Sequence, residues 1–202
     1  MEDNNRTMVE MPEYESHGTI IVKWIQILFV CEIVRVVLAA PSAIPEIPSF
    51  TGWISRVVSV AVIVSLFNLA AVNERYRKAA IFYCISVGGG IVLSLLHISA
   101  LTIVLSICSI IASYQELNAH SEITASKDAK LSGRWHSLFY LEMFAGVMVA
   151  VLGMIPAMIA VFAGVGADMI TSVMTIVLAL VNIAVGLLHV MYLKQTVTLF
   201  HK

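Results

Sequence analysis

Apolar residues fill six long stretches of this chain, and polar residues gather in the segments between them. A helix needs about 20 residues to cross a hydrocarbon core about 30 Å thick, and the lengths of the stretches fit this requirement. The pattern predicts an all-α polytopic membrane protein with six transmembrane helices arranged as three hairpins. The predicted spans are residues 18–40, 53–72, 79–96, 99–114, 137–163 and 168–193. Because the third and fourth spans are the shortest, a re-entrant pair at that place is the alternative.

Composition agrees with this prediction. Of the 202 residues, 59% are hydrophobic and 12% are charged, which is about half the charged fraction of a soluble domain. Residues 1–17 form a polar tail, and residues 18–202 form a single transmembrane domain whose main partner is the lipid bilayer. The net charge of −1 and the lack of a basic and aromatic surface predict no nucleic-acid partner.

The distribution of basic residues predicts the orientation. With six spans, ten of the twelve Lys and Arg residues fall on one side, and the opposite loops contain neither. Because Lys and Arg concentrate in cytoplasmic loops, we expect a cell-membrane protein with both termini in the cytoplasm. The two exceptions, Arg35 and Arg56, lie just inside the first and second spans.

A weak internal similarity appears where three spans begin. Lys23, Arg77 and Arg134 each precede a short apolar and aromatic run by four residues, at separations of 54 and 57 residues. Three repeated hairpins would produce this pattern. The general preference for basic and aromatic residues at membrane interfaces would produce it too, and we favour that explanation.

Small hydroxyl side chains follow one face of the fourth span. The spacing of three and four residues is that of a heptad seam, and the stripe continues into Glu116 and His120. Small residues let helices approach closely, so we favour a packing seam over a wetted path through the membrane. The seam residues are Ser99, Thr102, Ser106, Ser109 and Ser113.

The sixth span carries a second stripe in which Asp168, Thr175, Asn182 and His189 recur every seven residues. Asn182 falls near the bilayer centre, where lipid offers no hydrogen-bond partner. One hypothesis is an interhelical hydrogen bond from Asn182. The other is a polar pathway in which His189 accepts protons near the inner face. The sequence leaves both open.

Charged residues on the first hairpin form another candidate site. Glu32 and Arg35 are neighbours at i, i+3, and Glu32 lies well within the hydrocarbon. Arg56 begins the next span at a similar depth. These residues predict either an ion-pair network that fixes the hairpin or a charged pocket for a small polar ligand.

Glu116 and His120 share a helix face at i, i+4 and could supply two metal ligands, with His136 or Glu142 completing the set. The spacing is also common at solvated helix ends, so we expect no metal and no cofactor.

The sequence lacks the HExxH, GxSxG, P-loop and GxGxxG motifs, and we expect no enzymatic activity. The length and the six-span topology with both ends inside are similar to those of small substrate-binding subunits of bacterial vitamin importers, although the outer loops here are short. We therefore expect a transport or channel component that moves or binds a small polar solute or ion. The alternative is a non-catalytic assembly subunit, within a homo-oligomer or a membrane complex, whose stripes are packing seams.

Overall fold

The computed structural model describes residues 13–42, 50–96, 101–163 and 168–201, and all secondary structure in this part of the chain is helical. The helices are α1 (Glu13–Ser42), α2 (Phe50–Leu69), α3 (Glu74–Leu96), α4 (Thr102–Ala125), α5 (Ala129–Ala163) and α6 (Asp168–Phe200). Several of them extend past the predicted spans. In particular, α4 and α5 together cover most of residues 115–136, which we had placed in a polar segment between spans.

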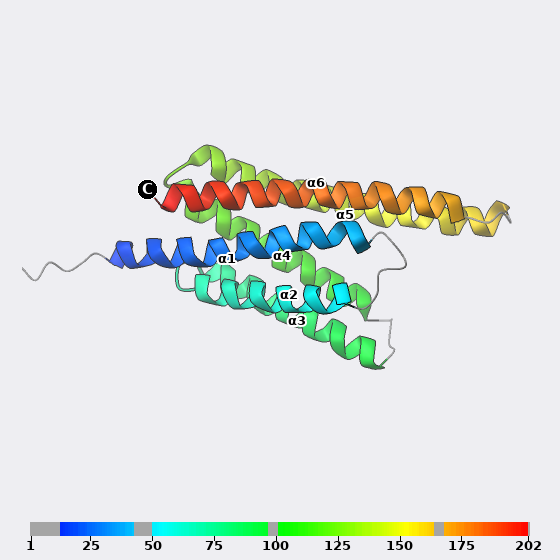
Figure 1. Cartoon of the computed structure of the whole chain (residues 1–202), viewed down its shortest axis with the longest axis horizontal. Coiled ribbons are helices and arrows are strands. Elements are labelled where there is room, and N and C mark those ends of the chain that lie inside the picture. Colours follow the sequence, from blue (N-terminus) through cyan, green and yellow to red (C-terminus); the bar gives the residue numbers. More distant parts are fainter. Residues whose placement is uncertain (1–12, 43–49, 97–100, 164–167, 202) are drawn as a thin grey trace, which may run out of the picture.

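The six helices form a closed ring. Each helix packs mainly against its neighbours in the sequence, and α1 completes the ring by packing against α6. The start of α1, the end of α6, the α2–α3 turn and the α4–α5 turn all lie at one end of the bundle, on the left in Figure 1. We call this end the turn end. Towards the other end, the α3–α4 and α5–α6 hairpins diverge (Figure 1).

Side-chain caps define the two turns at the turn end. The Asn73 side-chain oxygen accepts a hydrogen bond from the backbone N–H of Arg75 at the start of α3. The Asp128 carboxylate accepts bonds from the backbone N–H groups of Lys130 and Leu131 at the start of α5. These bonds satisfy N–H groups that a helix start leaves without an intrahelical partner, and so they fix where the chain reverses.

The most deeply buried side chains lie towards the turn end. Five of the six buried residues of α4 fall in its second half, and those of α3 all fall in its first half. The largest fully buried side chains include Trp135, Tyr76 and Leu69. Polar contacts also join helices here, among them an ion pair of 2.7 Å between Arg75 Nε and Glu122 Oε1.

The outer surface of the bundle is apolar. Large hydrophobic side chains are exposed on all six helices, including Val37, Val57, Leu95, Ile103, Phe144 and Leu180. Large hydrophobic side chains exposed on every helix are more typical of a membrane or interaction surface than of a soluble monomer. Within the described residues, three helices are long and apolar enough to cross a membrane, over Gly52–Leu69, Glu74–Leu96 and Ala179–Phe200. The chain is therefore an all-helical protein whose surface is compatible with a membrane location.

Two glycines mark close approaches between helices. A Cβ atom at Gly186 of α6 would lie 2.5 Å from a methyl group of Val36 on α1. A Cβ atom at Gly89 of α3 would lie 2.6 Å from a methyl group of Leu105 on α4. A larger residue at either glycine would require the facing side chain to shift, and small residues at membrane-helix interfaces commonly permit such close approach.

Candidate functional site

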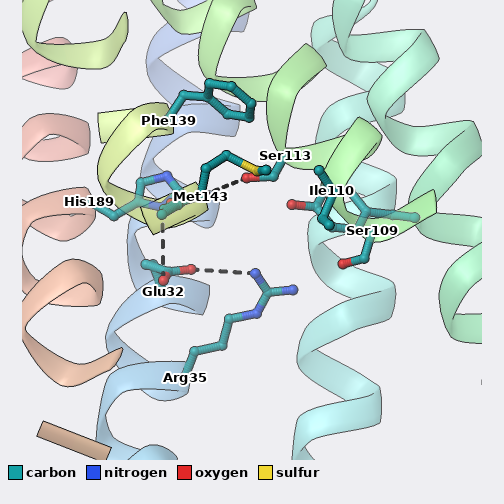
Figure 2. A pocket seen from close by; sticks show the side chains of 10 residues that line it. Glu32, Arg35, Ser109, Ile110, Ser113, Phe139, Met143 and His189 are labelled. Carbon is teal, nitrogen blue, oxygen red and sulfur yellow. Dashed lines mark hydrogen bonds and ion pairs between the residues drawn. The ribbon is translucent and has the colours of Figure 1, made fainter. Parts of the chain in front are cut away.

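A polar cavity of about 380 Å³ lies inside the ring. It is lined by side chains from five of the six helices, and Figure 2 shows how they converge. The polar lining residues are Glu32, Arg35, Tyr83, Ser109, Ser113, Glu142 and His189. Ionisable residues inside a bundle with an apolar exterior are costly and are usually functional, so this cavity is the candidate site.

Figure 2 shows Glu32 between Arg35 and His189, with an interaction to each. Its Oε2 accepts a hydrogen bond of 3.4 Å from Arg35 Nη1, so the two residues interact as their i, i+3 spacing predicts. Its Oε1 lies 3.9 Å from His189 Nδ1. The contact at Gly186 brings α6 close enough to α1 for this approach, since Gly186 lies less than one helical turn before His189.

Glu142 joins α5 to the same site. It accepts a hydrogen bond from the Ser113 hydroxyl of α4, and its Oε1 lies 3.8 Å from His189 Nδ1. His189 therefore lies between two carboxylates, from α1 and from α5. It is largely buried, with 8% of its surface exposed.

Glu116 and His120 lie deeper in the bundle, towards the turn end. The Tyr83 hydroxyl donates a hydrogen bond of 2.9 Å to Glu116 Oε2. The Tyr76 hydroxyl shares a hydrogen bond of 2.8 Å with His120 Nδ1. The indole of Trp135 stacks on the His120 ring, with 4.4 Å between ring centroids. We had expected these two residues near a solvated helix end. They are buried instead, because α3 and α5 cover this face of α4.

The charges of the site and its surroundings do not balance. The cavity wall holds the carboxylates of Glu32 and Glu142 and the guanidinium of Arg35. Glu116 lies behind the wall and accepts a hydrogen bond from the lining residue Tyr83, and it brings the formal charge to −2 with neutral imidazoles. A low-dielectric surrounding strengthens the attraction of such a site for positive charge. The site is therefore suited to a cation or to a ligand with a cationic group.

Other predicted site residues lie elsewhere. Arg56 is exposed on α2, and its guanidinium lies over the Trp53 ring at 5.2 Å, so it takes no part in the ion pair between Glu32 and Arg35. Asn182 is exposed on α6 and has no hydrogen bond to another described residue. His136, proposed as a third metal ligand, is exposed and packs edge-on against Tyr140.

The predicted seam on α4 divides into two parts. Thr102 and Ser106 are exposed, and the Ser106 hydroxyl bonds back to the Thr102 carbonyl of its own helix. Ser109 and Ser113 are half-buried and line the cavity. Ser99 lies outside the described residues, as do the side chains of Asp168 and Thr175.

No expectation from the sequence included Tyr83 of the cavity wall, or Tyr76 and Trp135, which contact His120 next to it. Tyr76 and Tyr83 stand seven residues apart on α3, and Trp135 stands seven residues before Glu142 on α5. The same spacing drew attention to the sixth span. Aligning these seven-residue repeats across all six spans would have pointed to the missing residues.

Comparison of the chain with protein families, with curated proteins and with solved structures found no match. Its function is therefore inferred from the site itself.

Proposed function

We propose that this protein is a transport or channel component of the cell membrane, and that it binds or moves a small polar solute or ion through the cavity inside its six-helix ring. The observation that carries the proposal is the convergence of seven polar side chains from five helices in one cavity, inside a bundle with an apolar exterior. Packing alone does not require so many ionisable groups, and within a membrane each of them is costly.

The ligand that best fits the site is a cation. The two carboxylates of the cavity wall, with that of Glu116 behind Tyr83, exceed its one guanidinium. The hydroxyls of Ser109, Ser113 and Tyr83 add oxygen atoms that can coordinate or accept hydrogen bonds. A cavity of about 380 Å³ has room for a hydrated ion or a small organic cation. The proposed role is binding and passage rather than catalysis.

The proposed topology has six spans, with residues 73–78, residues 115–136 and both termini on the cytoplasmic face. Supporting this topology, successive helices run in opposite directions, and the start of α1 and the end of α6 lie with the α2–α3 and α4–α5 turns (Figure 1). Basic residues concentrate at the same end: Arg75, Arg77 and Lys78 begin α3, and Lys127 and Lys130 flank the start of α5. That is the distribution expected of the cytoplasmic side.

The test is cation flux into liposomes that contain the purified full-length protein, with K⁺, Mg²⁺ and Zn²⁺ as probes and Cl⁻ as the control ion. Ser109→Leu places a branched apolar side chain in the cavity, and we expect it to lower flux of the transported cation at least about tenfold. Ser106→Leu is the matched control, because Ser106 is one turn away and exposed. It should transport like the unmodified protein. Absence of flux for every probe, or equal flux for both variants, would contradict the proposal.

A second candidate function is that of an assembly subunit in a homo-oligomer or a membrane complex. It is favoured by the exposed polar residues Thr102, Ser106 and Asn182, which lie among exposed apolar side chains of α4 and α6. An Asn side chain has two donors and an acceptor, which a partner helix could satisfy and lipid could not. Crosslinking through a cysteine at position 182 in native membranes would identify such a partner.

A further inference from the structure

Three buried side chains, at the side of the cavity that faces the turn end, have the composition of a metal centre. Glu116 and His120 come from α4, and His189 comes from α6. One carboxylate oxygen and one nitrogen from each ring lie within 4.8 Å of one another. The closest printed pair, Glu116 Oε1 and His120 Nε2, is 3.9 Å apart.

The two imidazoles each have an unused nitrogen. Nε2 of His120 and Nε2 of His189 are shielded from solvent, and neither has a hydrogen-bond partner within the described part of the chain. A buried polar atom left without a partner costs free energy, so such atoms call for an explanation. Two of them, on the rings of one cluster that also holds the buried carboxylate of Glu116, point to a bound group that satisfies both.

The other nitrogen of each ring, Nδ1, has oxygen neighbours of a kind that suits metal binding at Nε2. Nδ1 of His120 shares its hydrogen bond with the Tyr76 hydroxyl, and donation from Nδ1–H leaves a lone pair on Nε2. Nδ1 of His189 lies 3.8 Å from Glu142 and 3.9 Å from Glu32. Metal-binding histidines commonly direct their second nitrogen to a carboxylate or another oxygen, which fixes the ring orientation.

The size of the cluster is also compatible with an ion. Bonds of about 2.0–2.2 Å in a tetrahedral site place ligand atoms roughly 3.3–3.6 Å apart. The ligand atoms here lie up to 4.8 Å apart, which is wider by about 1.2–1.5 Å, and side-chain rotations would close this gap. Two imidazoles and one carboxylate leave a fourth position for water or a further oxygen ligand.

We infer that Glu116, His120 and His189 bind a divalent transition-metal ion of the Zn²⁺ class. Imidazole nitrogens favour Zn²⁺, Co²⁺ and related ions, whereas Ca²⁺ and Mg²⁺ prefer sites made of oxygen atoms. The inference deepens the proposed function, since His189 belongs both to this centre and to the wall of the cavity. A cation that crosses the cavity reaches the centre at this residue.

The test is metal binding by the full-length protein, purified in detergent, stripped with a chelator and titrated with Zn²⁺ by calorimetry. We expect one Zn²⁺ per chain and no comparable binding of Mg²⁺ or Ca²⁺. Glu116→Gln, His120→Gln and His189→Gln should each weaken Zn²⁺ binding at least about 100-fold. Loss of an outer-shell partner costs about 10- to 100-fold, and Tyr76→Phe should fall within or below that range.

His136→Gln is the matched control, because His136 is exposed on α5 and packs against Tyr140. It should bind Zn²⁺ within about twofold of the unmodified protein. X-ray absorption of Zn²⁺ bound to the unmodified chain provides a measurement that does not depend on whether a variant folds. Two imidazole ligands and oxygen neighbours at about 2.0–2.2 Å would support the site.

Several results would overturn the inference: no stoichiometric Zn²⁺ binding, sulfur ligands in the absorption spectrum, or loss of binding in His136→Gln but not in the three site variants. The Zn²⁺-binding test and the cation-flux test can fail independently of each other. Zn²⁺ binding without cation flux would retain the metal centre and reject transport. Cation flux without Zn²⁺ binding would retain the transport proposal and reject the metal centre.

Discussion

The two halves of α4 carry the same seven-residue polar pattern in opposite surroundings. From the middle of α4 to the turn end, Glu116 and His120 are buried, and Ser113 donates a hydrogen bond to Glu142. In the other half, Thr102 and Ser106 are exposed, next to exposed apolar residues such as Ile103. A single stripe on one helix therefore begins on the outer surface of the bundle and ends inside it.

Helix α6 shows the same contrast. Asn182 is exposed, whereas His189, seven residues later, is buried between two carboxylates. Seven residues of a straight α-helix return to nearly the same face, with a drift of about 20°. Such a small rotation does not account for the difference. The neighbouring helices do, because α1 and α5 approach α6 closely at His189.

Residues on the exposed and the buried parts of these helices also differ in chemistry. A serine on an exposed helix face can bond to its own backbone, as Ser106 does to Thr102 at 3.0 Å, and so needs no partner helix. A carboxylate or an imidazole has no comparable local solution in an apolar medium. These groups occur where other helices supply partners, such as Tyr83 for Glu116 and Tyr76 for His120.

The largest expected loss of stability comes from Trp135→Ala, a substitution in the buried part of the bundle near the turn end. This indole is fully buried, stacks on His120 and packs edge-on against His189 and Tyr192. Removing it should lower the free energy of unfolding by about 3–5 kcal/mol, the usual cost of emptying a buried aromatic site. The measurement is equilibrium unfolding of the purified protein in mixed micelles.

Trp53→Ala is the matched control for that change. Trp53 lies on α2 at the end where the hairpins diverge, and 64% of its surface is exposed. Its contact with Arg56 is worth about 0.5–1 kcal/mol, so only a small loss is expected. If both Trp substitutions lowered stability equally, the two ends of the bundle would not differ in packing as described.

An intermediate effect is expected from Glu32→Gln, which leaves the guanidinium of Arg35 without its carboxylate. Because the pair is partly buried, we expect a loss of about 1–3 kcal/mol of unfolding free energy. The double substitution Glu32→Gln with Arg35→Gln should recover part of this loss, because it removes the uncompensated charge.

The control is Glu74→Gln, which removes a carboxylate from an exposed pair with Arg77 at the same i, i+3 spacing. Exposed pairs of this kind contribute about 0.3–0.5 kcal/mol. A Glu32→Gln protein as stable as the Glu74→Gln protein would show that Glu32 is not held by an ion pair. The carboxylate would then be free to serve the ligand.

The smallest expected effect compares two serines on α4. Ser113→Ala removes the hydrogen bond to Glu142 and should cost about 1–2 kcal/mol. Ser106→Ala removes a bond within its own helix at an exposed position and should change stability by less than about 0.5 kcal/mol. Thermal unfolding of the two variants side by side measures the difference. Equal shifts would mean that the two halves of the stripe share one environment.

Some features of the fold and the site could be predicted from local sequence. The apolar runs predict six helices, since each run is long enough to form one and is bounded by polar turns. The interaction between Glu32 and Arg35 follows from i, i+3 spacing on a single helix, and the structure confirms it. The heptad spacing on α4 also predicts that Ser113, Glu116 and His120 share one face.

The tertiary structure alone decided which parts of these faces lie inside the bundle. Periodicity fixes the direction of a side chain around its own helix, but it carries no information about which helix stands opposite. Glu116 and His120 lie close to His189 only because α1, α5 and α6 close the ring. That closure depends on close contacts such as Gly186 against Val36, which join segments about 150 residues apart in the chain.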